Sequence, residues 1–238
     1  MKKKVLAIAL AVAMLAIIVS GSLAYFTADD KVTNTFTIGS VLIDIWENGV
    51  VTDREQVLFD ETLIPIVNTA DPAQDDNYIP KVVKVQNTGN NAAYIRVHIA
   101  QPVNLLGYLN LDIDATGWQR VSTTYATLGT QEYIVVTYDY QTAVDPAGFT
   151  PELLKGAYLD AAVDIKANAD GDLEFCKPNS NGGYDFSGFV AHKAIGNGAY
   201  TSETVSVLVF AQAIQANGFS DATTALKEGF GVNKNPWQ

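Results

Sequence analysis

Carboxylates grouped in turn-like segments are the side chains of this sequence best suited to binding a ligand. Asp170, Asp172 and Glu174 alternate around Gly171, so their oxygen atoms could share one face of a tight turn. Oxygen-rich loops of this kind can hold calcium, although this one does not match the Asp-x-Asp-x-Asp-Gly loop with its distal glutamate. A second acidic group, for which the same holds, comprises Asp71, Asp75 and Asp76. Charges that simply face water are the alternative for both groups, and calcium is the only cofactor for which the sequence offers ligands.

Groups that could act as nucleophiles or zinc ligands are few. His98 and His192 lie far apart and outside the His-Glu-x-x-His pattern, in which two imidazoles face one metal. The single cysteine, Cys176, has no histidine nearby in the sequence, and neither a Gly-x-Ser-x-Gly elbow nor a phosphate loop occurs. Cys176 can form no internal disulfide, so it either links two chains or is a buried small side chain. The sequence therefore predicts no catalytic residues and no enzyme.

The charge balance also restricts the partners. The chain of 238 residues carries 15 basic and 26 acidic side chains, a net charge of −11. Nucleic-acid binding needs a basic surface, so this class of partner is excluded. An acidic surface keeps an exported protein dispersed or makes its assembly depend on salt.

Strand patterns dominate the elements that must position these residues. Alternating or β-branched stretches occupy residues 33–45, 78–86, 94–100, 132–140, 158–166 and 204–214. The turn sequence at residues 87–91 predicts a hairpin between the second and third of these strands. The most apolar stretch, 204–214, should lie centrally in a sheet, because it would promote aggregation if exposed.

Helix signals are scarce. Ser220 can cap a helix that carries Asp221 in its first turn and ends near Phe230, before Gly231. A second short helix is predicted at residues 151–156, and residues 68–77 and 103–117 are predicted to be surface loops. Many strands with little helix predict an all-β protein. We expect an antiparallel, jelly-roll-like β-sandwich with a few short helices, including one at the C-terminus.

The first residues of the chain are typical of a secretory signal. Three lysines at positions 2–4 precede fifteen apolar residues, 5–19, and small residues follow at Ser22 and Ala24. This pattern predicts removal of a signal peptide, residues 1–24, by cleavage between Ala24 and Tyr25. A single domain would then span residues 25–238. An uncleaved anchor is the alternative, although the apolar run is shorter than the ~20 residues that a membrane span needs.

Several segments resemble a known family. They are the junction Gly21 to Phe26 (GSLAYF), residues 34–43 (NTFTIGSVLI), residues 84–97 (KVQNTGNNAAYIRV) and the ending at residues 211–231. Scattered over most of the chain and in this order, they are similar to motifs of the TasA/camelysin family. The resemblance implies a jelly-roll fold, export through the dedicated signal peptidase SipW, and a subunit of an extracellular matrix or surface fibre.

The resemblance also implies a mode of assembly. Members of the family polymerise by donor-strand exchange, in which the freed N-terminal segment of one subunit adds a strand to a sheet of the next. Here the candidate donor strand spans residues 25–36, with apolar contacts from Tyr25, Phe26, Val32 and Phe36. The alternative is that this segment is a flexible lead-in or pairs within its own subunit.

Three functions follow as hypotheses. The first is a secreted, non-enzymatic fibre subunit whose partners are further copies of itself, other matrix proteins and SipW, and which meets the membrane only through its signal segment. The second is a secreted metallopeptidase of camelysin type, for which the sequence shows no zinc motif. The third is a monomeric cell-surface module that binds a glycan or a protein through exposed aromatic side chains.

Overall fold

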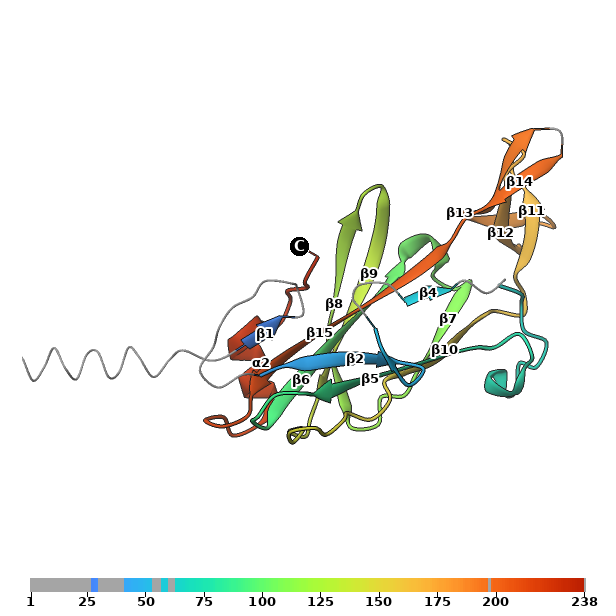
Figure 1. Ribbon diagram of the computed structural model, residues 1–238. Helices are drawn as coiled ribbons and strands as arrows, with labels where there is room; N and C mark the ends of the chain where they lie inside the picture. Colours follow the sequence, from blue (N-terminus) through green and yellow to red (C-terminus); the bar gives the residue numbers. More distant parts are fainter. Residues whose placement is uncertain (1–26, 30–40, 53–56, 60–62, 197, 238) are drawn as a thin grey trace, which may run out of the picture.

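The computed structural model describes residues 27–29, 41–52, 57–59, 63–196 and 198–237, and Figure 1 shows that strands dominate. Within these residues, the first sheet has six strands. In spatial order they are β1 (Thr27–Asp29), β15 (Val205–Gln215), β6 (Ala93–Pro102), β9 (Gln131–Tyr140) and β8 (Trp118–Leu128), with β4 (Val57–Phe59) also paired to β15. The second sheet has the order β3 (Val50–Val51), β2 (Ile43–Glu47), β5 (Ile79–Asn87), β10 (Leu154–Leu159) and β7 (Leu109–Ile113).

The chain winds through these two sheets as a jelly roll. The first and last long strands, β2 and β15, contact each other across the sandwich. Moving inward along the chain from both ends, β5 pairs with β10 and β6 pairs with β9, both antiparallel. The innermost strands, β7 and β8, lie at the far side in different sheets. The predicted antiparallel β-sandwich of jelly-roll type is therefore confirmed.

The core lies between the two sheets. Alternate residues of β5, β6 and β15 point into it, because side chains of a strand alternate between its two faces. The fully buried examples are Val83, Val85, Ile95, Val97, Val207, Ala211 and Ala213. In β15 the face that points away from the core is also covered, so both faces carry apolar residues. This is why β15 is the most apolar strand of the sequence.

The C-terminal helix and the residues after it cover the outer face of the first sheet. Helix α2 (Ala222–Phe230) packs Ala222, Ala225 and Leu226 against Ile214 of β15. The chain then crosses the same face, where Trp237 lies edge-on to His98 and Phe210. The predicted C-terminal helix is thus confirmed, although its cap is Asp221, whose side chain accepts a hydrogen bond from the Thr224 amide, rather than Ser220.

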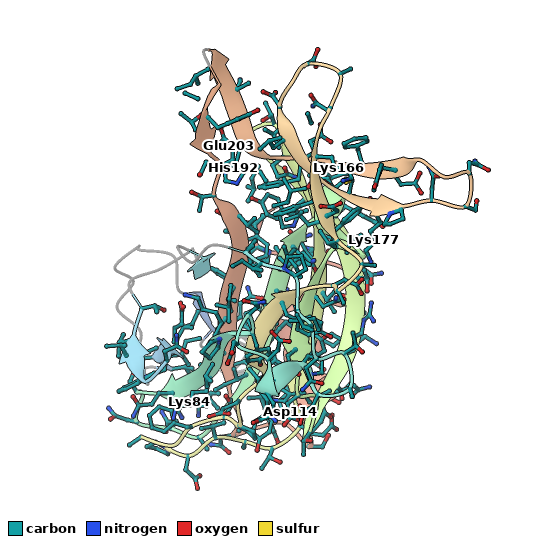
Figure 2. The ribbon with its side chains drawn as sticks, turned by 90° about the vertical axis from the view of Figure 1, so that its right-hand side faces the viewer. Lys84, Asp114, Lys166, Lys177, His192 and Glu203 are labelled. Atoms are coloured by element: carbon teal, nitrogen blue, oxygen red, sulfur yellow. The ribbon has the colours of Figure 1, made fainter. Side chains whose placement is uncertain are left out.

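A third sheet projects from the end of the sandwich opposite α2 and β1 (Figure 1). It is an insertion between β10 and β15 and comprises β11 (Asp164–Ala167), β12 (Leu173–Pro178), β13 (Tyr184–Gly196) and β14 (Ala199–Ser202). We call it the arm. Figure 2 shows Lys166, Lys177, His192 and Glu203 at this end, and Lys84 and Asp114 at the opposite end. Phe175 and Phe189 stack with ring centroids 5.8 Å apart where the arm meets the core.

Several predictions of local structure are wrong. The turn at residues 87–91 joins β5 to β6, but these strands belong to different sheets and form no hairpin. Residues 151–156 contain the start of β10 rather than a helix, and the predicted loop 103–117 contains β7 after a short 3₁₀ helix, Val103–Leu105. The predicted strand 158–166 is split between β10 and β11. Residues 68–77 are a loop, as predicted, with a 3₁₀ turn at Pro72–Gln74.

Candidate functional site: the outer edge of strand β15

The edge of β15 that faces away from β6 is where the N-terminal part of the chain meets the first sheet. Thr27, Ala28 and Asp29 of β1 pair antiparallel with Ile214, Ala213 and Gln212. At the other end of the same edge, β4 pairs with Val205–Val207. Among the described residues, no strand covers Leu208–Ala211 on this side. Figure 1 shows β1 at the α2 end of the sheet and β4 nearer the arm.

The hydrogen-bonding direction along β15 follows from its pairing with β6. The amide of Ala216 donates to the carbonyl of Ala92 at 2.8 Å, in the same register that runs through the whole β15–β6 pair. In an antiparallel pair, successive residues direct their N–H and C=O groups alternately toward and away from the partner. The main-chain groups of Val209 and Ala211 therefore face the outer edge, between β1 and β4.

The outer face of the first sheet, on the other side of β15 from β1, contains a buried ion pair that sequence reasoning missed. Arg96 and Asp139 form a bidentate pair, with Nε–Oδ1 and Nη2–Oδ2 distances of 2.6 and 2.9 Å, and both side chains are 1% exposed. Arg96 also donates through Nη1 to the carbonyl of Gly231, at the end of α2. The sequence shows only a polar alternation in this strand, and nothing in it identifies Asp139 as the partner.

His98 lies next to this pair. Its Nδ1 is 2.9 Å from Oγ1 of Thr137, and its Nε2 is 3.0 Å from Oε1 of Gln212. Burial, with a smaller contribution from the positive charge of Arg96, lowers the pKa of His98 to about 4, so the ring is neutral at pH 7. His98 therefore connects β6, β9 and β15, and its contact on β15 is Gln212, a residue that pairs with β1.

The predicted cleavage and donor-strand residues are only partly described. Ala24, Tyr25, Phe26, Val32 and Phe36 lie outside the described residues. Of the candidate donor strand 25–36, only Thr27–Asp29 is described, and its strand partner is β15 of the same chain. No helix within the described part of the chain has the length and apolar character needed to span a bilayer.

Two of the proposed calcium ligands, Asp172 and Glu174, accept hydrogen bonds from main-chain and side-chain donors of the arm. Glu174 accepts from Asn168 Nδ2 at 2.6 Å and from the Gly188 amide at 3.2 Å, and Asp172 accepts from the Ala194 amide at 2.8 Å. Asp170 is exposed at the tip of the β11–β12 turn. These contacts orient the loops of the arm. Across the described residues, no group of three or more histidine, cysteine, aspartate or glutamate side chains is placed to hold a metal ion.

The remaining chemical candidates are dispersed. Among the second acidic group, Asp75 accepts hydrogen bonds from the amides of Asn68, Asn77 and Val67 at 2.5, 2.9 and 2.7 Å, and these bonds lower the pKa of its carboxyl. Cys176 is buried in the arm, where burial raises the pKa of its thiol. His192 contacts Ser202 at 3.0 Å. These groups lie on separate loops and strands, so the β15 edge is the more informative feature.

No protein-family model, no curated protein and no solved structure matches this chain.

Proposed function

We propose that this chain is a secreted structural subunit of an extracellular matrix or surface fibre. In this proposal the signal peptide is removed after Ala24, and subunits join when the N-terminal segment of one copy pairs with β15 of the next. Its main partners are further copies of the same chain and other matrix proteins. The observation that carries the proposal is the pairing of β1 with Gln212–Ile214 at the edge of the first sheet.

The exchange needs no new kind of contact. A strand that pairs with β15 in its own subunit can make the same main-chain hydrogen bonds with β15 of another subunit, as in domain swapping. Among the described residues, β1 pairs with β15 over three residues, Thr27–Asp29, and the main-chain hydrogen bonds of this pair would open for the exchange. The residues Leu208–Ala211 extend the same edge and offer main-chain groups to a longer incoming strand.

A disulfide placed across the β1–β15 pair tests the proposal directly. Asp29 and Gln212 are Cα partners, and the carbonyl and amide of Gln212 face β6, so the pair is of the non-hydrogen-bonded type, a position that suits an engineered disulfide. We would prepare Asp29→Cys/Gln212→Cys in a Cys176→Ala background, let the protein assemble under reducing conditions, and then oxidise it. The proposal expects a ladder of disulfide-linked multimers on a non-reducing gel.

A control variant and two contrary results complete this test. Asp29→Cys/Ser206→Cys places the second thiol at the β4 end of the edge, where Ser206 is the partner of Leu58, and it should give no ladder. Fibres seen by electron microscopy that yield only monomers with an internal disulfide would refute exchange at this edge. Fibre formation by a chain that lacks residues 25–36 would refute it as well.

A further inference from the structure

The jelly roll is open at the side where β7 and β8 lie. Among the described residues, β7 pairs only with β10 and β8 pairs only with β9, so no main-chain hydrogen bonds join the two sheets there. A cavity of about 300 Å³ lies at this side. We call it the β7–β8 cleft, and its volume is at the lower end of the range for small-molecule sites.

The walls of the β7–β8 cleft are mostly apolar and come from both sheets. Ile99 of β6 and Ile134 and Val136 of β9 form one wall, and β7 supplies the other. The apolar residues from β7 are Leu109, Leu111 and Ile113, and the polar residues Gln101 and Asn110 also line the cleft. Ile99 and Leu109 are buried, but Leu111, Ile113, Ile134 and Val136 are only half-buried. Apolar surface therefore remains in contact with solvent inside a concave site.

A cationic group lies at the rim of the cleft. Arg120 of β8 is the cross-strand partner of Tyr138 of β9, and both side chains line the cleft. Nη2 of Arg120 donates to Oγ1 of Thr123 at 2.7 Å, which orients the guanidinium. Within the described residues, Arg120 forms no ion pair, unlike Arg96, Lys81, Lys155, Lys166 and Lys177. The guanidinium of Arg120 is exposed and is therefore accessible to an anionic group at the rim of the cleft.

We propose that the β7–β8 cleft binds a small amphiphile with an apolar body and a carboxylate head, such as a medium-chain fatty acid. The body lies between β7 and β9, and the carboxylate pairs with Arg120. The apolar walls account for the body, because covering them removes exposed apolar surface from water. The charge at the rim accounts for the head, because guanidinium groups bind carboxylates through two parallel hydrogen bonds. This inference does not depend on fibre assembly.

Methyl-detected NMR titration of the exported protein with octanoate and octan-1-ol tests the proposal. Octanoate should shift the methyl signals of Ile99, Ile113 and Ile134 saturably and leave those of Ile165 and Ile195, which lie on the arm, unchanged. Arg120→Gln should weaken octanoate binding about fivefold, the upper range for an exposed ion pair, without affecting octan-1-ol. Lys193→Gln, a change at an exposed cation of β13, is the matched control and should leave both affinities unchanged.

A variant that fills the cleft tests the contribution of the ligand's apolar body separately from that of its head group. Val136→Phe places a larger side chain in the wall and should abolish the binding of both ligands, provided that circular dichroism shows a folded protein. If Val136→Phe does not fold, the octanoate affinity of the surface variant Arg120→Gln still tests the proposal. Three results would overturn the proposal: no saturable shift at the three isoleucines, shifts confined to the arm, or equal octanoate affinity in Arg120→Gln and the unaltered protein.

Discussion

The buried ion pair of Arg96 and Asp139 allows a direct test of how polar groups on the outer face of the first sheet contribute to stability. Replacing Asp139 with alanine removes two charge-assisted hydrogen bonds and leaves the guanidinium, 1% exposed, with the carbonyl of Gly231 as its hydrogen-bond acceptor. Removing one member of a buried pair lowers stability by about 3–5 kcal/mol, because the other charge stays in a medium of low dielectric. A domain is stable by only about 5–15 kcal/mol, so this loss is easily measured.

The assay is equilibrium unfolding in urea followed by far-ultraviolet circular dichroism. Asp139→Ala should reduce the free energy of unfolding by about 3–5 kcal/mol. The double variant Arg96→Met/Asp139→Leu should recover at least ~1 kcal/mol of this, because it removes the uncompensated charge and leaves apolar side chains of similar size. Recovery on adding a second substitution distinguishes an unpaired charge from a simple loss of packing.

A more exposed ion pair, also between a basic side chain and an aspartate, serves as the control. Lys155 and Asp114 lie 2.7 Å apart, but their side chains are 44% and 31% exposed. Asp114→Ala should therefore lower stability much less than Asp139→Ala does, since water and salt screen the pair. Equal effects of Asp139→Ala and Asp114→Ala, or a double variant less stable than Asp139→Ala, would refute this reasoning.

Three further predictions concern single positions. Because burial lowers the pKa of His98 from 6.5 to about 4, the unfolded chain binds the proton more tightly than the folded protein does. The free energy of unfolding should therefore be highest above pH 6.5 and fall by roughly 3 kcal/mol as the pH drops to 4. In His98→Gln, urea unfolding at both pH values should show a smaller fall. Gly156→Ala would place a Cβ 2.6 Å from the carbonyl oxygen of Ile79 and against the ring of Tyr78, so its melting temperature should drop by an amount equivalent to about 1–3 kcal/mol, and an unchanged value would contradict the packing. Asp221→Ala removes the cap of α2 and should lower the urea midpoint of unfolding, whereas Ser220→Ala should have the smaller effect.

Local patterns predicted the elements that depend on nearby residues. The alternation in β5, β6 and β9 follows from burial of one face or both, and the structure confirms these strands to within one or two residues at each end. Helix α2 was also predictable, because its cap, its apolar spacing and its terminal glycines all lie within a dozen residues. The first turn nevertheless shows a limit, since Ser220 and Asp221 are both good caps and only the backbone geometry selects Asp221.

Pairing over long distances decided what the sequence could not. Residues 151–156 satisfy helix rules locally, but Leu154 lies between Val83 of β5 and Ile113 of β7, and two ladders of hydrogen bonds outweigh a weak helix preference. The turn after β5 has a typical hairpin sequence, yet its two strands enter different sheets because Asn87 pairs with Ile43. No local pattern contains the identity of a partner strand.

The candidate sites show the same division. The acidic composition, the signal-like N-terminus and the β-rich class are properties of the sequence itself, since each depends on residue type and short-range order. The edge of β15 shared by β1 and β4, the ion pair of Arg96 with Asp139 and the cleft beside Arg120 each join residues from distant parts of the chain. They exist only once the jelly roll has closed, because packing between the sheets, rather than any local preference, brings these residues together.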